Sequence, residues 1–374
     1  MLKKYLFTSE SVTEGHPDKV CDMVSDAILD AILNQDKNAR VACETMVTMG
    51  KVIVSGEITT SASIDYKKIV SETISLIGYS ENDLNNDYSK YQIEVIIKKQ
   101  SPHIAQGVNQ ELDKEQGAGD QGLMFGYACN ETEELMPAPI HYSHKILRLM
   151  ADDRKKGNLK GIEPDNKSQV TMLYENNKPV KVTSVVISTQ HSKDINQDKV
   201  KELVIPYIKK SIPSNFLKSL DPNEIYINPT GQFIIGGPDG DTGLTGRKII
   251  VDTYGGASPH GGGAFSGKDP TKVDRSAAYV ARYIAKNIVA AGVSNKCLIQ
   301  LSYAIGVSKP LSIYLKLSEK DEDKTHELIK IINNNFDLSP RGIRELLGLN
   351  KPIYKITAAY GHFGRKSNEK GEFS

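Results

Sequence analysis

Glycine is concentrated in one part of the chain. Between Gly236 and Gly267, 11 of 32 positions are glycine, whereas the whole sequence has 30 in 374. Glycine loses more conformational entropy on folding than any other residue, so this density needs a physical reason. Close approach of backbone N–H groups to anionic oxygens is one reason. A set of tight turns between strands is the alternative.

Cationic and acidic residues alternate beside these glycines. The cations are Arg247, Lys248, Lys268, Lys272 and Arg275, and the aspartates are Asp269 and Asp274. This mixture suits a polyphosphate bound with Mg²⁺, because cations contact phosphate oxygens and carboxylates bind the metal. A solvated helix start with surface ion pairs is the alternative.

One of the glycine-rich segments resembles a P-loop. Residues 262–268 match its first seven positions, but the eighth is Asp269. A P-loop has Ser or Thr there to bind Mg²⁺, and a carboxylate would repel phosphate. Residues 257–260 also lack the pattern of a buried strand. A P-loop NTPase is therefore a weak match, although Lys268 stays a candidate phosphate ligand.

A histidine, an aspartate and a lysine come together near the N-terminus, in the run His16-Pro17-Asp18-Lys19. Pro17 suits the first position of a helix, which leaves His16 at or near the cap. The unpaired N–H groups and the dipole of a helix N-terminus favour an anion. A structural histidine is the alternative.

Two glutamates are expected on one face of a hairpin. A two-residue turn at Met49-Gly50 pairs Glu44 with Ser55 and makes Glu57 the diagonal neighbour of Glu44. Two carboxylates could hold an ammonium group or a metal ion. General acid–base chemistry and plain solvent exposure are the alternatives.

The elements that must position these residues alternate between strand and helix, which predicts an α+β fold of sheets covered by helices. Strands are expected at 41–47, 52–58, 91–99, 168–174, 180–188, 297–305 and 311–317, with a hairpin turn at Asn176-Asn177. Helices are expected after Pro17 and at 140–156, 198–210, 271–291 and 324–334. The polar stretch 101–119 is expected to be a long functional loop, with a disordered insertion as the alternative.

Length and composition narrow the class of protein. The 374 residues suggest two or three domains, and 39% hydrophobic with 25% charged residues is typical of a globular protein. The formal charge of +1 gives no general basic field, so we expect no nucleic-acid partner. No apolar run approaches the ~20 residues that span a bilayer, so we expect no membrane association. Four scattered cysteines without a CxxC pair favour a reducing cytoplasm.

Four motifs together are specific enough to identify a family. They are Glu-Gly-His-Pro-Asp-Lys at 14–19, Gly-Ala-Gly-Asp-Gln-Gly at 117–122, the glycine-rich run 236–248 and the run 261–269. With them the chain closely resembles methionine adenosyltransferase (S-adenosylmethionine synthetase). The resemblance extends from Phe7 to Arg365.

The resemblance implies that ATP, L-methionine and water give S-adenosylmethionine, phosphate and pyrophosphate, with two Mg²⁺ and one K⁺ in each site. It also implies three similar α+β domains in a pseudo-threefold arrangement, interleaved along the chain. The expected divisions are 1–100, 119–235 and 236–374, with a mobile active-site loop at 101–118. A homodimer with shared active sites, usually a homotetramer, is expected.

The resemblance assigns roles to individual residues. The catalytic residues would be His16, Lys167, Arg247 and Lys268. ATP would be bound by His16, Asp165, Lys167, Gln232, Phe233, Asp241, Arg247, Lys248, Ala264 and Lys268. Methionine would be bound by Glu57, Gln100, Asp120, Asp241, Lys272 and Ile305. Asp18 and Asp274 would bind Mg²⁺, and Glu44 would bind K⁺.

Three positions depart from the family pattern, namely His103, Asn166 and Asp239. They put loop kinetics and affinity in doubt, and not the reaction. Two other functions compete with this one. A regulatory relative without transferase activity would have lost catalytic residues, and none is missing. A kinase or NTPase would turn over ATP without methionine.

Overall fold

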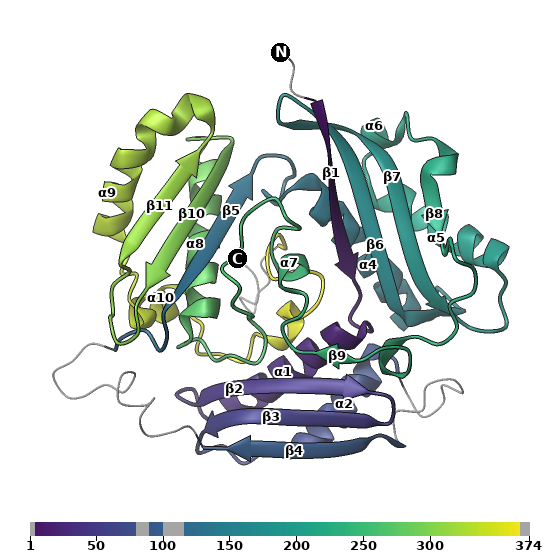
Figure 1. Ribbon diagram of the computed structural model, residues 1–374, viewed down its shortest axis with the longest axis horizontal. Coiled ribbons are helices and arrows are strands. Elements are labelled where there is room, and N and C mark those ends of the chain that lie inside the picture. Colours follow the sequence, from purple (N-terminus) through teal and green to yellow (C-terminus); the bar gives the residue numbers. More distant parts are fainter. Residues whose placement is uncertain (1–3, 80–89, 100–115, 367–374) are drawn as a thin grey trace.

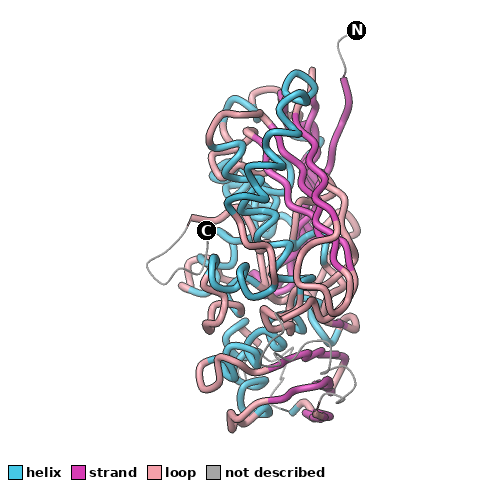
Figure 2. Tube along the Cα trace, turned by 90° about the vertical axis from the view of Figure 1, so that its left-hand side faces the viewer, coloured by secondary structure: helices cyan, strands magenta, loops and turns pink. Residues whose placement is uncertain are grey.

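Three β-sheets stand next to one another, each with helices on one face (Figure 1). The computed structural model describes residues 4–79, 90–99 and 116–366. Seen from the side, strands lie toward one surface of the molecule and helices toward the other (Figure 2). The expected α+β class, with sheets covered by helices, is confirmed.

The first sheet carries the expected glutamate hairpin. Its strand order is β4-β3-β2-β9, from Gln92–Lys98, Lys51–Thr59, Arg40–Thr48 and Gly243–Leu244. Helix α1 (Pro17–Leu33) packs on β2, and α2 (Tyr66–Ile77) packs on α1 and β4. Thr48 pairs with Lys51 and Glu44 with Ser55, as the two-residue turn predicts.

The second sheet has the order β1-β6-β7-β8, from Lys4–Val12, Ile162–Glu175, Lys178–His191 and Ile225–Ile227. Helix α4 (Ala138–Lys155) covers β1 and β6, and α5 (Gln197–Ser211) packs on α4. Asn176 and Asn177 turn the β6–β7 hairpin with φ values of 52° and 62°. Two successive positive φ values are typical of a type I′ turn, which confirms the expected hairpin.

The third sheet has the order β11-β10-β5, from Ser312–Leu317, Lys296–Tyr303 and Gly122–Cys129. Helix α8 (Val273–Ala290) packs on β5 and β10, α9 (Thr325–Asn335) on β11, and α10 (Pro340–Leu347) on α8. The sequence had not indicated β1, β5, β8, α2 or α10. The short apolar run 249–251 has the length of a core strand, yet it forms one turn of helix, α7 (Ile249–Asp252).

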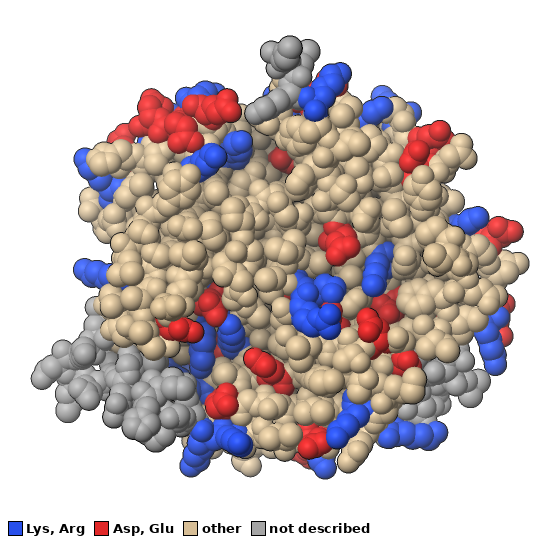
Figure 3. Space-filling view, viewed as in Figure 1, with Lys and Arg blue, Asp and Glu red and all other residues tan. Residues whose placement is uncertain are grey.

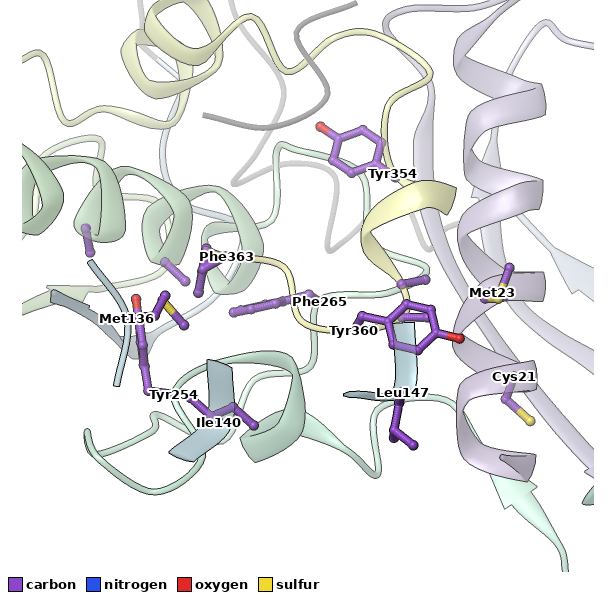
Figure 4. Packing of buried hydrophobic residues seen from close by; sticks show 14 of the residues in the cluster. Cys21, Met23, Met136, Ile140, Leu147, Tyr254, Phe265, Tyr354, Tyr360 and Phe363 are labelled. Atoms are coloured by element: carbon purple, nitrogen blue, oxygen red, sulfur yellow. The ribbon is translucent and has the colours of Figure 1, made fainter. Parts of the chain in front are cut away.

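Every sheet includes a strand that is distant in sequence. β1, near the N-terminus, pairs with β6, which begins only at residue 162. In the same way β5 pairs with β10, and β9 pairs with β2. An aromatic group including Tyr254, Phe265 and Phe363 is buried where the three parts meet (Figure 4). The rings of Tyr254 and Phe363 are stacked with centroids 5.3 Å apart. The segments that carry the candidate site are therefore held by long-range contacts.

Candidate active site

His16 caps helix α1 and is almost fully buried, with 4% of its surface exposed. The backbone N–H of Asp18 donates to its Nδ1 at 3.2 Å, so the proton of the neutral ring is on Nε2. Burial, followed by the charges of Lys248 and Lys167, lowers the pKa of His16 to about 3. His16 is therefore neutral near pH 7, and its Nε2–H is a hydrogen-bond donor.

The approach to this cap leaves no room for a side chain at Gly15. A Cβ there would lie 2.4 Å from the carbonyl oxygen of Pro164. The hydroxyl of Tyr79 donates to the carbonyl oxygen of Gly15 at 2.7 Å. These contacts fix the backbone of the turn that leads into the histidine.

Asp18 is buried beside His16 and is held by the glycine-rich loop. Its Oδ2 accepts from Lys248 Nζ at 2.5 Å, and its Oδ1 accepts from Leu244 N at 2.9 Å. A guanidinium nitrogen of Arg247 is 4.0 Å from Oδ1. Burial, the largest effect, raises the pKa of Asp18, but the hydrogen bonds from Lys248 and Leu244 outweigh it, so the pKa lies below its usual value.

Strand β6 brings further expected residues to the same place. Asp165 is buried, and its Oδ2 accepts from Gly237 N at 2.9 Å, while its Oδ1 has no partner. Burial raises the pKa of Asp165 to about 6, against the effect of the Gly237 hydrogen bond. Lys167 is exposed and pairs across the sheet with Val12, at the end of β1. Its charge lowers the pKa of both Asp165 and His16.

Phe233 is half-buried, and its backbone exchanges hydrogen bonds with His191 at 2.9 and 3.1 Å. Gln232 and Asp241 are exposed, and the charge of Asp241 acts on the pKa of Asp165. We call this the His16 cluster. Its members are His16, Asp18, Asp165, Lys167, Phe233, Asp241, Arg247 and Lys248.

A second group of expected residues surrounds a pocket of about 170 Å³. Lys268 Nζ lies 2.5 Å from Asp274 Oδ2, and Lys272 caps α8 and pairs with Asp269. The pocket is also lined by Asp120 and by Arg40, which the sequence had not indicated. We call this the Lys268 cluster. Its members are Arg40, Asp120, Lys268, Lys272 and Asp274.

Residues between the two clusters come from closely packed loops. A Cβ on Gly246 would be 2.5 Å from Cβ of Ala264, so the loops that carry Lys248 and Lys268 touch. Among the described residues, however, no hydrogen bond or ion pair that we find links the His16 cluster to the Lys268 cluster. One chain therefore presents two neighbouring charged sites.

The remaining expected residues lie at the surface. Glu44 and Glu57 are exposed on the outer face of the first sheet, and Ala42 lies between Glu57 and Lys268 in the strand pairing. Ile305 is 58% exposed and pairs with Ala118. Gln100, and with it most of the expected loop 101–118, lies outside the described residues.

Two residues of the expected polyphosphate group have another role. Arg275 and Asp269 are fully buried, so neither can contact a ligand in the pocket. Asp269 accepts from Val41 N at 2.6 Å and from Thr271 N at 2.9 Å. The P-loop comparison fails as well. Helix α8 begins only at Val273, and Asp269 is buried and holds the turn before this helix.

Asp22, Asp26 and Asp30 were missed, although they continue from Asp18 at intervals of four. Each accepts a backbone N–H from another segment, namely Gly246 N at 2.9 Å, Gly267 N at 2.8 Å and Tyr354 N at 2.9 Å. Residues four apart share one face of a helix. This periodic row of carboxylates was the available signal.

The departures from the family pattern are built into the fold. The hydroxyl of Tyr91 donates to Asp239, which ties the glycine-rich loop to the residue before β4. Asn166 donates to Glu163 O at 2.9 Å and accepts from the hydroxyl of Thr189. His103 lies outside the described residues.

The described residues contain no group of three or more His, Cys, Asp or Glu side chains that could hold a metal ion. Asp18 and Asp274 each offer carboxylate oxygens next to a lysine. Mg²⁺ is commonly bound by one or two carboxylates together with substrate phosphates and water. The donors present thus fit Mg²⁺ that is bound together with a polyphosphate. No helix in the described segments is long and apolar enough to cross a membrane.

Three sheets covered by helices and two neighbouring clusters of paired charges are typical of an α+β protein that binds a polyphosphate. Models of the N-terminal, central and C-terminal domains of S-adenosylmethionine synthetase match residues 4–102, 115–233 and 235–372. The chain belongs to the S-adenosylmethionine synthetase family. It is a methionine adenosyltransferase, which forms S-adenosylmethionine from ATP and methionine.

Relatives support the assignment along the whole chain. An S-adenosylmethionine synthase of Pelagibacter ubique is 64% identical over 100% of this chain and 96% of its own length. Those of Parvibaculum lavamentivorans and Paramagnetospirillum magneticum are 57% and 56% identical, over 99% and 100% of this chain and 95% and 96% of their own lengths.

Proposed function

We propose that the His16 and Lys268 clusters together bind the triphosphate of ATP while the methionine sulfur displaces it from C5′. One observation carries this proposal. Two of the lysines proposed to bind phosphate are paired with the two carboxylates proposed to bind Mg²⁺, Lys248 with Asp18 and Lys268 with Asp274, both at 2.5 Å. A magnesium polyphosphate supplies the opposite charge to both members of each pair, so it can replace both ion pairs at once.

The chemistry needs cations more than it needs a base. The thioether sulfur of methionine is neutral and nucleophilic, so no proton has to be removed from it. Negative charge builds up on the triphosphate as the C5′–O bond breaks, and preorganised donors stabilise that charge. We assign this role to His16, through its Nε2–H, and to Lys167, Arg247 and Lys268. The same groups then assist hydrolysis of the triphosphate to phosphate and pyrophosphate.

The remaining assignments follow the family pattern. Asp165, Gln232, Phe233, Asp241, Lys248 and Ala264 would complete the ATP site, with the ring of Phe233 stacked on an aromatic face. Glu57 would bind the methionine ammonium group, and Gln100, Asp120, Asp241, Lys272 and Ile305 would surround the rest of the amino acid. The proposed domains are 1–100, 119–235 and 236–374, with residues 101–118 as a loop over the site.

We further propose two Mg²⁺, held by Asp18 and Asp274 with the polyphosphate, and one K⁺ at Glu44. When bound, Mg²⁺ would neutralise part of the phosphate charge and orient the leaving group. The test is S-adenosylmethionine formation, followed by mass spectrometry, as a function of Mg²⁺ concentration. Asp18→Asn and Asp274→Asn should each need more Mg²⁺ than the wild type. Asp198→Asn, which changes an exposed carboxylate at the start of α5, is the control. Unchanged Mg²⁺ dependence in the first two variants would contradict the assignment.

A homodimer with shared sites, and a homotetramer built from it, complete the proposal. The outer sheet faces carry exposed apolar side chains, including Met46, Leu123, Leu244 and Tyr314. A space-filling view of the side seen in Figure 1 shows a broad area without charged residues (Figure 3). Such a surface favours an interface. If each site combines the His16 cluster of one subunit with the Lys268 cluster of its partner, inactive His16→Ala and Lys268→Ala subunits should regain activity when they are refolded together. Mixed dimers without activity would contradict a shared site.

A cytoplasmic location is also proposed. All four cysteines are free and buried, which fits a protein that is kept reduced. A methionine-independent NTPase is excluded if ATP turnover stops when methionine is left out of the same mass-spectrometry assay.

A further inference from the structure

A buried ion pair contacts the backbone of Lys268. Arg275 on α8 and Asp26 on α1 are both fully buried, and their two nitrogens and two oxygens are joined at 2.7 and 2.8 Å. The Arg275 guanidinium also lies over the ring of Tyr354, with 4.1 Å between Cζ and the ring centroid. No ligand can reach this pair, so its role in the reaction can only be indirect.

The pair binds the loop that ends at Lys268 through both kinds of backbone group, carbonyl oxygens and an N–H. Arg275 Nη1 donates to Phe265 O at 2.9 Å and to Lys268 O at 3.2 Å. Asp26 Oδ1 accepts from Gly267 N at 2.8 Å. Three of the four consecutive residues from 265 to 268 therefore bind one buried pair of side chains through their backbones.

The loop cannot relax toward the opposite side. Gly267 has a φ of +79°, and a Cβ at this position would lie 1.8 Å from the carbonyl oxygen of Cys43. Gly267 O also accepts from Cys43 N at 2.9 Å. The loop is therefore confined between β2 and the Asp26–Arg275 pair, and the Lys268 side chain extends from this fixed backbone to Asp274.

We propose that Arg275, together with Asp26, is a positioning residue that fixes the backbone of Lys268 for its contact with the triphosphate. This inference rests on the proposed function of Lys268. The planar guanidinium is suited to the task, because its rigid donors can bind a carboxylate and two carbonyl oxygens at the same time. A lysine at 275 would keep the charge opposite Asp26 but could not reproduce this set of contacts.

The test compares Arg275→Lys with Arg282→Lys. Arg282 is a matched control because it is buried on the same helix and donates to three carbonyl oxygens, those of Tyr127, Glu134 and Leu135, at 2.7–2.9 Å. None of those three residues belongs to either cluster. Both variants should lose similar stability in thermal unfolding. We expect kcat to fall about 100-fold only in Arg275→Lys, because small displacements of a catalytic group have effects of that size. The KM for methionine should stay near the wild-type value.

A double-mutant cycle distinguishes positioning from a general structural effect. If Arg275 acts through Lys268, Arg275→Lys should reduce kcat little further when Lys268 is already alanine. Independent losses that multiply would overturn the inference, and so would equal losses of kcat in Arg275→Lys and Arg282→Lys. Near-normal kcat in Lys268→Ala alone would instead contradict the proposed function of Lys268.

A measurement on the wild type keeps the inference testable if Arg275→Lys does not fold. Hydrogen exchange read on peptides that cover residues 261–270 should show strong protection of the Gly267 amide in the absence of substrates. Rapid exchange of this amide would overturn the inference, since the loop would then not be held before ATP binds.

Discussion

The neutral state of His16 leads to a prediction that separates catalysis from folding. His16→Ala removes both the cap of α1 and the Nε2–H donor, whereas His16→Asn keeps a good capping side chain and removes only the long donor. Both variants should lose the contact with the triphosphate. Only the alanine variant should also lose the helix cap.

The two effects differ in size. Loss of an N-cap costs about 1 kcal/mol of stability, and loss of one preorganised donor costs about 10²–10³ in kcat. Both variants should therefore lose about 100-fold or more in kcat, while only His16→Ala becomes measurably less stable. Initial rates of S-adenosylmethionine formation and thermal unfolding of the same preparations provide the two readouts. Nearly wild-type kcat in His16→Asn would refute the role of the ring.

The pH dependence gives a second, independent check. With a pKa of about 3, His16 does not titrate between pH 6 and pH 9. The ratio of wild-type to His16→Asn kcat/KM should therefore be constant over this range. A ratio that increases toward acid with a midpoint near 6.5 would mean that an imidazolium, and not the neutral ring, acts on the triphosphate.

The same pKa predicts how His16 affects acid unfolding. Because the pKa is lower in the folded than in the unfolded chain, only the unfolded imidazole takes up a proton between about pH 6.5 and pH 3. His16 should therefore cost the wild type up to about 1.4 kcal/mol of stability per pH unit as the pH falls through this window. His16→Asn should be less sensitive to acid by that amount, and equal acid sensitivity would contradict the burial argument.

Three further predictions concern single residues. Arg40→Ala should raise the KM for ATP about tenfold with little change in melting temperature, because Arg40 lines the pocket without a partner that we find in the described part of the chain; an unchanged KM would remove it from the site. Burial raises the pKa of Asp30 to about 7. The contribution of Asp30 to the free energy of unfolding should therefore be lost as the pH rises from about 4 to 7, and Asp30→Asn should not show this loss. Melting curves of both proteins at pH 5 and pH 8 would test this. Gly267→Ala should prevent stable folding because its Cβ would strike Cys43 O. Gly262→Ala, also at positive φ but in open space, should cost about 1–2 kcal/mol and stay active, as expression and melting curves would show.

The sequence predicted local structure well where neighbouring residues determine it. The register of the 40–59 hairpin followed from one two-residue turn, and the Asn176-Asn177 turn followed from the conformations that asparagine tolerates. Strands β1 and β5 were missed because their pairing partners, β6 and β10, lie more than 140 residues away. No local pattern records such a contact.

The sequence indicated which kinds of residue form the site, but it did not indicate which of them are buried or exposed. The spacing of His16, Asp18 and Pro17 indicated a charged helix start, and the cap is present. The same reasoning placed Arg275 with the phosphate-binding cations, because a charged residue is normally expected at the surface. Its burial depends on Asp26, which is 249 positions away, so only the folded chain reveals that it is structural.

Helix α1 explains how the glycine-rich loops can hold one conformation, although glycine allows many. Asp18, Asp22, Asp26 and Asp30 accept backbone N–H groups from residues 244, 246, 267 and 354. Glycine-rich loops have few side chains with which to anchor themselves, so an external acceptor must hold their amides. Because His16 begins the helix that provides all four acceptors, the histidine and the two glycine-rich loops share one support. A displacement of α1 would therefore move His16 and both loops together, and this shared support holds each loop in place before any substrate is bound.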